Sequence, residues 1–161
     1  MHGLKIAQAG MLLAALSLPG STVQAAISPF TAMAGEWSGG GVLNTSDGQH
    51  ERLRCRAAYD VGGTGAELRL NLRCASASYN FDLTSEVRYR GGAIAGSWTE
   101  ASRNASGTIT GRANGNQIEA AARGQNFSAQ LSLATQGDRQ LVSIYPEGSN
   151  VTGVSLTLNR R

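Results

Sequence analysis

A short polar cluster follows a tryptophan near the middle of the chain, in the order Trp98-x-Glu100-x-x-Arg103-Asn104. Sites that bind small molecules combine an aromatic wall with a few fixed polar groups, and this cluster supplies both. The pattern predicts a ligand-binding mouth at one rim of the fold, formed by Trp98, Glu100, Arg103 and Asn104. The alternative is an ordinary β-hairpin end in which Glu100 and Arg103 form an ion pair.

Residue types for catalysis or metal binding are scarce. After His2, the only histidine is His50, which stands near Asp47 and beside Glu51. A catalytic histidine needs a second group that holds it in a pocket, and one histidine with two mobile carboxylates is a poor metal site. Glu100 has no second acid at a fixed spacing, as glycoside hydrolysis would need. We therefore expect no catalytic residue, no metal, no cofactor and no enzymatic activity.

The beginning of the chain has the pattern of a secretory signal. Lys5 gives a basic start, an uncharged apolar run follows, and Val23-Gln24-Ala25 supplies small residues at a cleavage position. The run is too short for a permanent membrane span, which needs about 20 apolar residues. We predict a signal peptide over residues 1–25 and a single domain over residues 26–161. The expected location is the periplasm or the exterior of the cell, with no membrane span in the mature chain.

The charges are mixed and spread along the chain. Lys5 is the only lysine, so the mature part carries 13 arginines against 11 acids, a net charge of +2. Because no basic block stands out, the composition argues against nucleic acid as a partner. The few aromatic residues also argue against an outer-membrane barrel, which needs aromatic girdles.

Turn signals divide the mature chain into short segments. Asp-Gly, Asn-Gly and Gly-Gly pairs favour tight hairpins because they tolerate positive φ angles. Nine such signals imply up to ten strands, and no segment between them is long enough for a crossover helix. We predict an all-β fold, an antiparallel up-and-down barrel of about eight to ten strands with one disulfide. A two-sheet β-sandwich is the alternative. The signals lie at residues 47–48, 62–65, 76–78, 91–92, 103–104, 114–115, 124–125, 137–138 and 148–149.

Alternation within the segments fixes which side chains face inward. Cys55 and Cys74 fall on the apolar faces of neighbouring strands, symmetrically about the Gly62–Gly65 turn. In an exported protein this pair predicts a disulfide across the hairpin, which leaves no free thiol. For the next hairpin, setting Cys74 opposite Phe81 creates three cross-strand charge pairs, a favourable register. These pairs are Arg73–Asp82, Arg69–Glu86 and Glu67–Arg88.

Three further segments carry local expectations. Residues 28–35 read as one helical turn, with Ser28 as N-cap and Gly35 as the stop, that closes a barrel end with Phe30 and Met33. The Gly39-Gly40-Gly41 run, with no helix after it, favours a β-bulge or a sharp barrel corner over a phosphate loop. Residues 118–123 are expected to form a strand.

Gly35-Glu36-Trp37 at the first strand, with Arg160-Arg161 at the chain end, resembles the Gly-x-Trp pattern of calycins, the superfamily of lipocalins, fatty-acid-binding proteins and avidins. The resemblance implies that Trp37 packs across the barrel floor beneath Arg160, both in structural roles. The chain is also similar to a bacterial metalloprotease inhibitor, an exported calycin-like barrel with one disulfide. It resembles, too, small exported bacterial proteins of unassigned function.

Two functions follow from these patterns. The first is an exported, non-enzymatic barrel that binds a small, partly apolar ligand. The second is a protein-interaction module, such as a protease inhibitor or cell-envelope factor, that uses loops or a rim. The expected partner is accordingly an unknown small molecule or an envelope protein. The interior of the first would include Leu68, Leu70, Phe81, Trp98 and Phe127.

Overall fold

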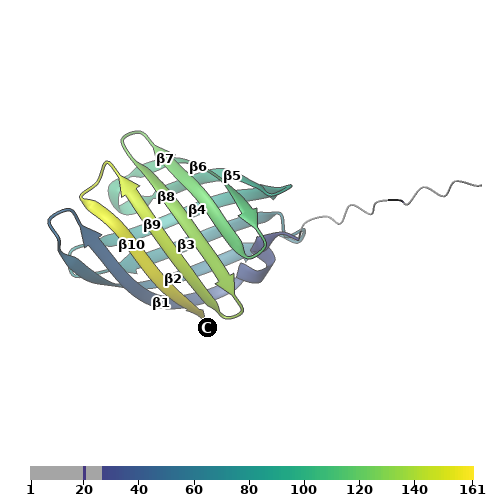
Figure 1. Ribbon diagram of the computed structural model, residues 1–161, viewed down its shortest axis with the longest axis horizontal. Helices are drawn as coiled ribbons and strands as arrows, with labels where there is room; N and C mark the ends of the chain where they lie inside the picture. Colours follow the sequence, from purple (N-terminus) through teal and green to yellow (C-terminus); the bar gives the residue numbers. More distant parts are fainter. Residues whose placement is uncertain (1–19, 21–26) are drawn as a thin grey trace, which may run out of the picture.

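The computed structural model describes residue 20 and residues 27–161. Residues 35–160 form a closed barrel of ten antiparallel strands (Figure 1). The predicted signal peptide lies outside the described residues, apart from Gly20. Each strand pairs with its neighbours in sequence, and β1 also pairs with β10, so the barrel has no free edge. The strands are β1 (Gly35–Thr45), β2 (His50–Val61), β3 (Glu67–Ala75), β4 (Asn80–Arg90), β5 (Ala93–Glu100), β6 (Ala105–Asn114), β7 (Gln117–Gly124), β8 (Ser128–Gln136), β9 (Arg139–Glu147) and β10 (Val151–Arg160).

This architecture confirms the predicted barrel over the sandwich. Seven of the nine predicted turns lie wholly between consecutive strands, and the other two begin on the last residue of β6 or β7. Residues 118–123 lie within β7. One turn is more elaborate than a tight hairpin, because a short 3-10 helix, η2 (Ala101–Arg103), links β5 to β6. In the described chain, no helix is both long and apolar enough to cross a membrane.

The predicted disulfide joins Cys55 of β2 to Cys74 of β3, with an S–S distance of 2.04 Å. The two residues are direct cross-strand partners, and both are buried. The register of the next hairpin is also confirmed, since Cys74 lies opposite Phe81. All three predicted ion pairs form on the outer surface: Arg69–Glu86 at 2.7 Å, Glu67–Arg88 at 3.2 Å and Arg73–Asp82 at 3.3 Å.

A 3-10 helix, η1 (Pro29–Met33), precedes the first strand and closes one end of the barrel. The Ser28 hydroxyl caps it by accepting a hydrogen bond from the backbone N–H of Phe30. Phe30 and Met33 are buried at 1% and 2% exposure, so the turn fills the opening as the sequence predicts. Gly35 follows with a φ of +113°, which glycine adopts without strain. We call this end the closed end.

Of the two expectations for Gly39–Gly41, a bulge or a sharp barrel corner, the bulge is wrong. Pairing with both β2 and β10 is regular through these glycines, and the register shift lies between Asn44 and Thr45. The glycines instead allow the backbones of the neighbouring strands to lie close to β1. A Cβ on Gly41 would lie only 1.7 Å from the carbonyl oxygen of Ser155, so a side chain there would force β1 and β10 apart.

A candidate ligand site inside the barrel

Trp37 and Arg160 meet at the closed end. Trp37 is fully buried, and its indole N–H donates to the carbonyl oxygen of Met33 at 2.8 Å. The guanidinium of Arg160 lies 4.3 Å from the centroid of the Trp37 ring. It also donates to the carbonyl oxygens of Ala32 and Ala34 in the chain around η1. These contacts join the end of the chain to its first structured turn.

A buried polar pair stands beside this floor. The Tyr59 hydroxyl donates to Oε1 of Gln140 at 3.0 Å, and the Gln140 amide donates to Thr135 at 3.3 Å. Burial raises the pKa of Tyr59 well above its ordinary value, although the hydrogen bond to Gln140 acts in the opposite direction. The phenol therefore stays protonated, and the pair is fully satisfied within the wall.

Above the floor, the interior is not completely filled. Cross-strand pairing places a ring of apolar side chains on the inner face, yet its members keep intermediate exposure. In a filled core, side chains at mid-strand would be almost fully buried. Solvent therefore reaches the inner wall along β3, β4 and β6 to β9. The wall residues are Leu70, Leu72, Leu83, Ile109, Ile118, Leu131, Leu133, Val142 and Ile144.

The composition of the inner face explains this space. About eight strands already enclose an interior that side chains just fill, and this barrel has ten. On β5 to β7 many inward positions carry glycine or alanine, including Gly96, Gly107, Gly111, Ala120 and Ala122. Short residues on a wider barrel leave room that the leucines opposite do not occupy.

The end of the barrel opposite η1, which we call the distal end, carries most of the predicted mouth. Trp98 is buried beside Phe127, with ring centroids 5.7 Å apart, and its N–H donates to the carbonyl oxygen of Thr108. Phe81 is partly exposed and stacks on Tyr79 at 6.3 Å. Aromatic rings thus lie on two sides of this end.

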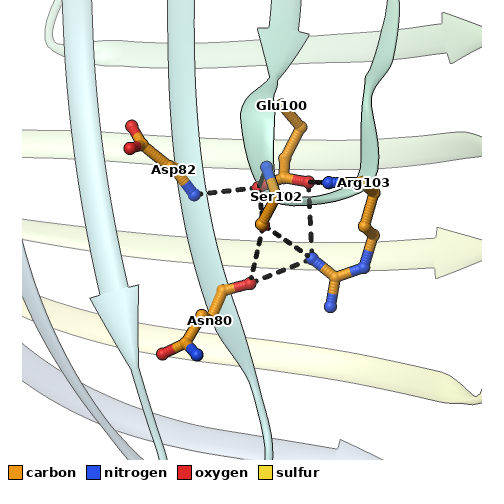
Figure 2. A network of polar contacts seen from close by, with 5 residues as sticks. All are labelled: Asn80, Asp82, Glu100, Ser102 and Arg103. Atoms are coloured by element: carbon orange, nitrogen blue, oxygen red, sulfur yellow. Dashed lines mark hydrogen bonds and ion pairs between the residues drawn. The ribbon is translucent and has the colours of Figure 1, made fainter.

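Glu100 ends β5 and is only 8% exposed (Figure 2). Its carboxylate accepts hydrogen bonds from the backbone N–H groups of Asp82, Ser102 and Arg103, and from the Ser102 hydroxyl. The guanidinium of Arg103 contacts it at 3.4 Å. Burial on its own would raise the pKa of Glu100, but these hydrogen bonds and the Arg103 charge together lower it. The carboxylate is therefore ionised and caps η2.

The structure brings Glu100 and Arg103 together. This agrees both with a ligand-binding mouth and with a hairpin end that holds an ion pair. Arg103 also donates to the carbonyl oxygen of Asn80 at 3.0 Å, and its guanidinium lies 4.8 Å from the centroid of the Phe81 ring. Asn104 stands apart, because it is exposed and has a left-handed backbone with a φ of +52°. An asparagine tolerates this left-handed turn position, so the turn explains the residue and no ligand is needed to explain it.

The sequence did not predict the contributions of three members of this network, Asn80, Asp82 and Ser102. Asn80 and Ser102 tie the start of β4 to η2, and the Ser102 hydroxyl lies 3.1 Å from the Asn80 carbonyl oxygen (Figure 2). The signal that could have found Ser102 is its position two residues after Glu100, where a serine joins a local capping arrangement. Nothing in the local sequence points to Asn80, since it contributes only a backbone carbonyl.

The residues considered for metal binding do not converge. His50 is exposed, and its Nδ1 lies 2.6 Å from the side-chain oxygen of Asn44. Asp47 instead accepts a hydrogen bond from the Thr45 hydroxyl. Glu51 accepts hydrogen bonds from the Ser76 hydroxyl and the backbone N–H of Ser78. Over residues 27–161, no three histidine, cysteine or acidic side chains gather into a metal-binding group, and no cysteine is free.

Comparison with known proteins finds solved structures with a similar fold but assigns no family. No family model matches the chain, and no curated protein matches it. Among solved structures, it is similar to the crystal structure of Rv2717c from M. tuberculosis, with a TM-score of 0.65 and 14% identity over 81% of this chain and 94% of that one. It is also similar to the S-type phycobiliprotein lyase CPES from Guillardia theta, with a TM-score of 0.62 and 9% identity over 82% and 90% of the two chains. At these identities the likeness concerns the fold alone, a closed antiparallel barrel.

Proposed function

We propose that this protein is a non-enzymatic carrier or receptor that binds a small, partly apolar ligand inside the barrel. One observation supports the proposal above the others: apolar side chains in the middle of the inner wall remain accessible to solvent. Soluble proteins seldom leave such surface unburied unless something covers it. A ligand in the barrel would cover it without any change in the strands.

The ligand would enter at the distal end. η1, Trp37 and Arg160 seal the closed end, whereas Phe81, Leu83 and Phe127 at the distal end are partly exposed. Within the predicted mouth, the roles differ. Glu100 is occupied by the turn that it caps, so Arg103 is the group that would receive a polar or acidic end of the ligand. Trp98 and Phe127 would supply the aromatic wall.

Export belongs to the same proposal. The secretory pattern over residues 1–25 and the Cys55–Cys74 disulfide both fit an oxidising compartment, such as the periplasm or the exterior of the cell. A carrier in such a compartment would meet ligands that are poorly soluble in water. Blocking oxidation during expression and comparing the yield of folded protein with the normal yield tests whether the disulfide is needed.

A fluorescent apolar dye tests the interior site directly. We expect the dye to bind the wild-type protein, and Leu131→Trp, which fills the inner wall, to weaken binding by about tenfold or more, since the lost space is part of the site. Gln130→Trp is the matched control, because it adds the same side chain one position away on the outer surface. Equal binding by both variants would place the dye outside the barrel and overturn the proposal.

A protein-interaction role has its own supporting observation. The outer face of β9, β10 and β1 carries its charged side chains, such as Glu36, Arg139 and Glu147, at or next to the strand ends, while Leu141 and Tyr145 are 45% and 58% exposed. An uncharged surface with exposed aromatic and aliphatic groups is typical of protein interfaces. Chemical cross-linking in cells tests this second function: a partner captured by the wild type should be lost with Tyr145→Asp, and one retained would argue against this face.

A further inference from the structure

A second pocket lies on the outer surface over β1 to β4. An open pocket of about 580 Å³ is lined there by arginines from two neighbouring strands, Arg54 and Arg56 of β2 and Arg73 of β3. Their side chains are exposed and alternate with the buried Cys55 and Cys74, which places them on the outer face. A volume of this size suits a small molecule rather than a single water or ion.

The arrangement of charge in this pocket is unusual. Arg56 and Arg73 are direct cross-strand partners, so two cations stand opposite each other where like charges destabilise a sheet. Arg73 has a counter-ion in Asp82, at 3.3 Å. Among the described residues, Arg54 and Arg56 form no ion pair. With three arginines and one aspartate, the lining carries a net charge of +2.

The disulfide holds these charges in place. Cys55 lies between Arg54 and Arg56 in β2, and its bond to Cys74 fixes the position of Arg73 beside them. Guanidinium groups on a rigid sheet lose less freedom when they bind, which favours a preorganised anion site. Ser38 and Gly39 of β1 and Asn80 of β4 complete the edges and add small or polar groups.

From this geometry we infer that the outer pocket binds a diphosphate-type anion, in which neighbouring phosphate groups meet two or more guanidinium forks. Arginine binds phosphate bidentately, and a ligand with at least two charges is needed to neutralise the pocket. Such phosphate groups are found in free small molecules and in lipid headgroups. The lining includes Phe81, which also lies at the distal end, but none of the leucine, isoleucine and valine residues of the inner wall. Arg54, Arg56 and Arg73 carry the inference, and they have no part in the proposed interior site.

Calorimetry with inorganic pyrophosphate at low ionic strength tests the inference. We expect binding by the wild-type protein and a loss of about tenfold or more with Arg56→Gln or Arg54→Gln, the effect of removing one charge-assisted contact. Arg123→Gln removes the same charge from exposed β7, outside the pocket, and should leave binding unchanged. Arg56→Lys should bind with intermediate strength, because it keeps the charge but loses the planar fork.

Further arms separate the possible explanations. Sedimentation with cardiolipin vesicles that pyrophosphate reverses would identify a lipid headgroup with two phosphate groups as the source of phosphate, and no sedimentation would leave free anions as the source. Leu131→Trp should bind pyrophosphate normally, even where it loses the apolar dye. Equal losses in the Arg56→Gln and Arg123→Gln variants, or no pyrophosphate binding by the wild type, would overturn the outer site.

Discussion

The guanidinium of Arg160 lies 4.3 Å from the centroid of the Trp37 ring and so joins the two ends of the barrel domain. Its other contacts reach Asp138 and two backbone carbonyl oxygens around η1. One side chain thus fixes the last strand, the first strand and the helical turn that closes the barrel. The contribution of Arg160 to the free energy of unfolding can be measured by comparison with its neighbour Arg161.

Arg160→Ala should lower the free energy of unfolding by about 1–3 kcal/mol, because it removes a cation–π contact and several charge-assisted hydrogen bonds. Urea denaturation measures this difference. Arg161→Ala is the control, since that side chain is exposed and makes no ion pair within the described residues. If the two variants were equally stable, Arg160 would have no special role at the closed end.

Loss of the disulfide should be comparably costly. Cys55 and Cys74 are 19 residues apart, and a loop of that length gives about 3 kcal/mol in the chain-entropy treatment. We expect Cys55→Ser to lower the stability by about 2–4 kcal/mol, measured by denaturation under oxidising conditions. The same variant under reducing conditions should match the reduced wild type. Equal melting temperatures of the oxidised and reduced wild type would contradict this prediction.

The cysteine pair also shows why much of this fold could be predicted. Its symmetric spacing about a glycine turn set the register of β2 on β3, and three opposite charges set that of β4. These are short-range patterns, in which each strand is compared only with the next. The same register places Arg56 opposite Arg73, so the arginine pair of the outer pocket follows from the same short-range pattern.

Other features lay beyond such patterns. Glu100 is buried because the backbone N–H of Asp82, 18 residues away, points at it, and backbone groups have no sequence signal. The Gly39–Gly41 run suggested a bulge or a sharp corner but not the close approach of β10, because that approach involves residues more than 110 positions later. Whether the interior was filled depended on the number of strands and on the side chains of all of them together.

Glu100→Gln should destabilise the protein by about 1–3 kcal/mol at neutral pH, since an amide cannot accept every hydrogen bond that the carboxylate accepts. The folded-state pKa of Glu100 is lowered, so its contribution is present above the unfolded value of about 4.5 and is lost as the pH falls through the folded pKa. Denaturation from pH 7 to pH 3 should therefore show the two curves converging in acid. The exposed Glu36→Gln provides the control, and a constant gap at all pH values would contradict the assigned role.

Tyr59 affects the stability of the protein at alkaline pH, whereas Glu100 affects it in acid. Burial raises its folded-state pKa, so the stability that it contributes is present below the unfolded value of 10.0 and decreases as the pH rises beyond that value. Tyr59→Phe should make the protein less sensitive to alkali, at a neutral-pH cost of about 1–2 kcal/mol for the unpaired Gln140. An absorbance titration of the wild type should show one of its four tyrosines ionising only on unfolding. Ionisation of all four together in folded protein would rule this out.

The outer arginines predict a variant that is more stable than the wild type. Arg56→Gln relieves the repulsion from Arg73 across the strand, so the free energy of unfolding should rise by a few tenths of a kcal/mol at low salt. Salt screens exposed charges, so the gain should disappear at high ionic strength. Added pyrophosphate should stabilise the wild type more than the variant, which would reverse their order because the variant binds the anion about tenfold more weakly. Thermal denaturation with and without the anion measures both effects, and a variant that is less stable under every condition would show that Arg56 serves the fold rather than a ligand.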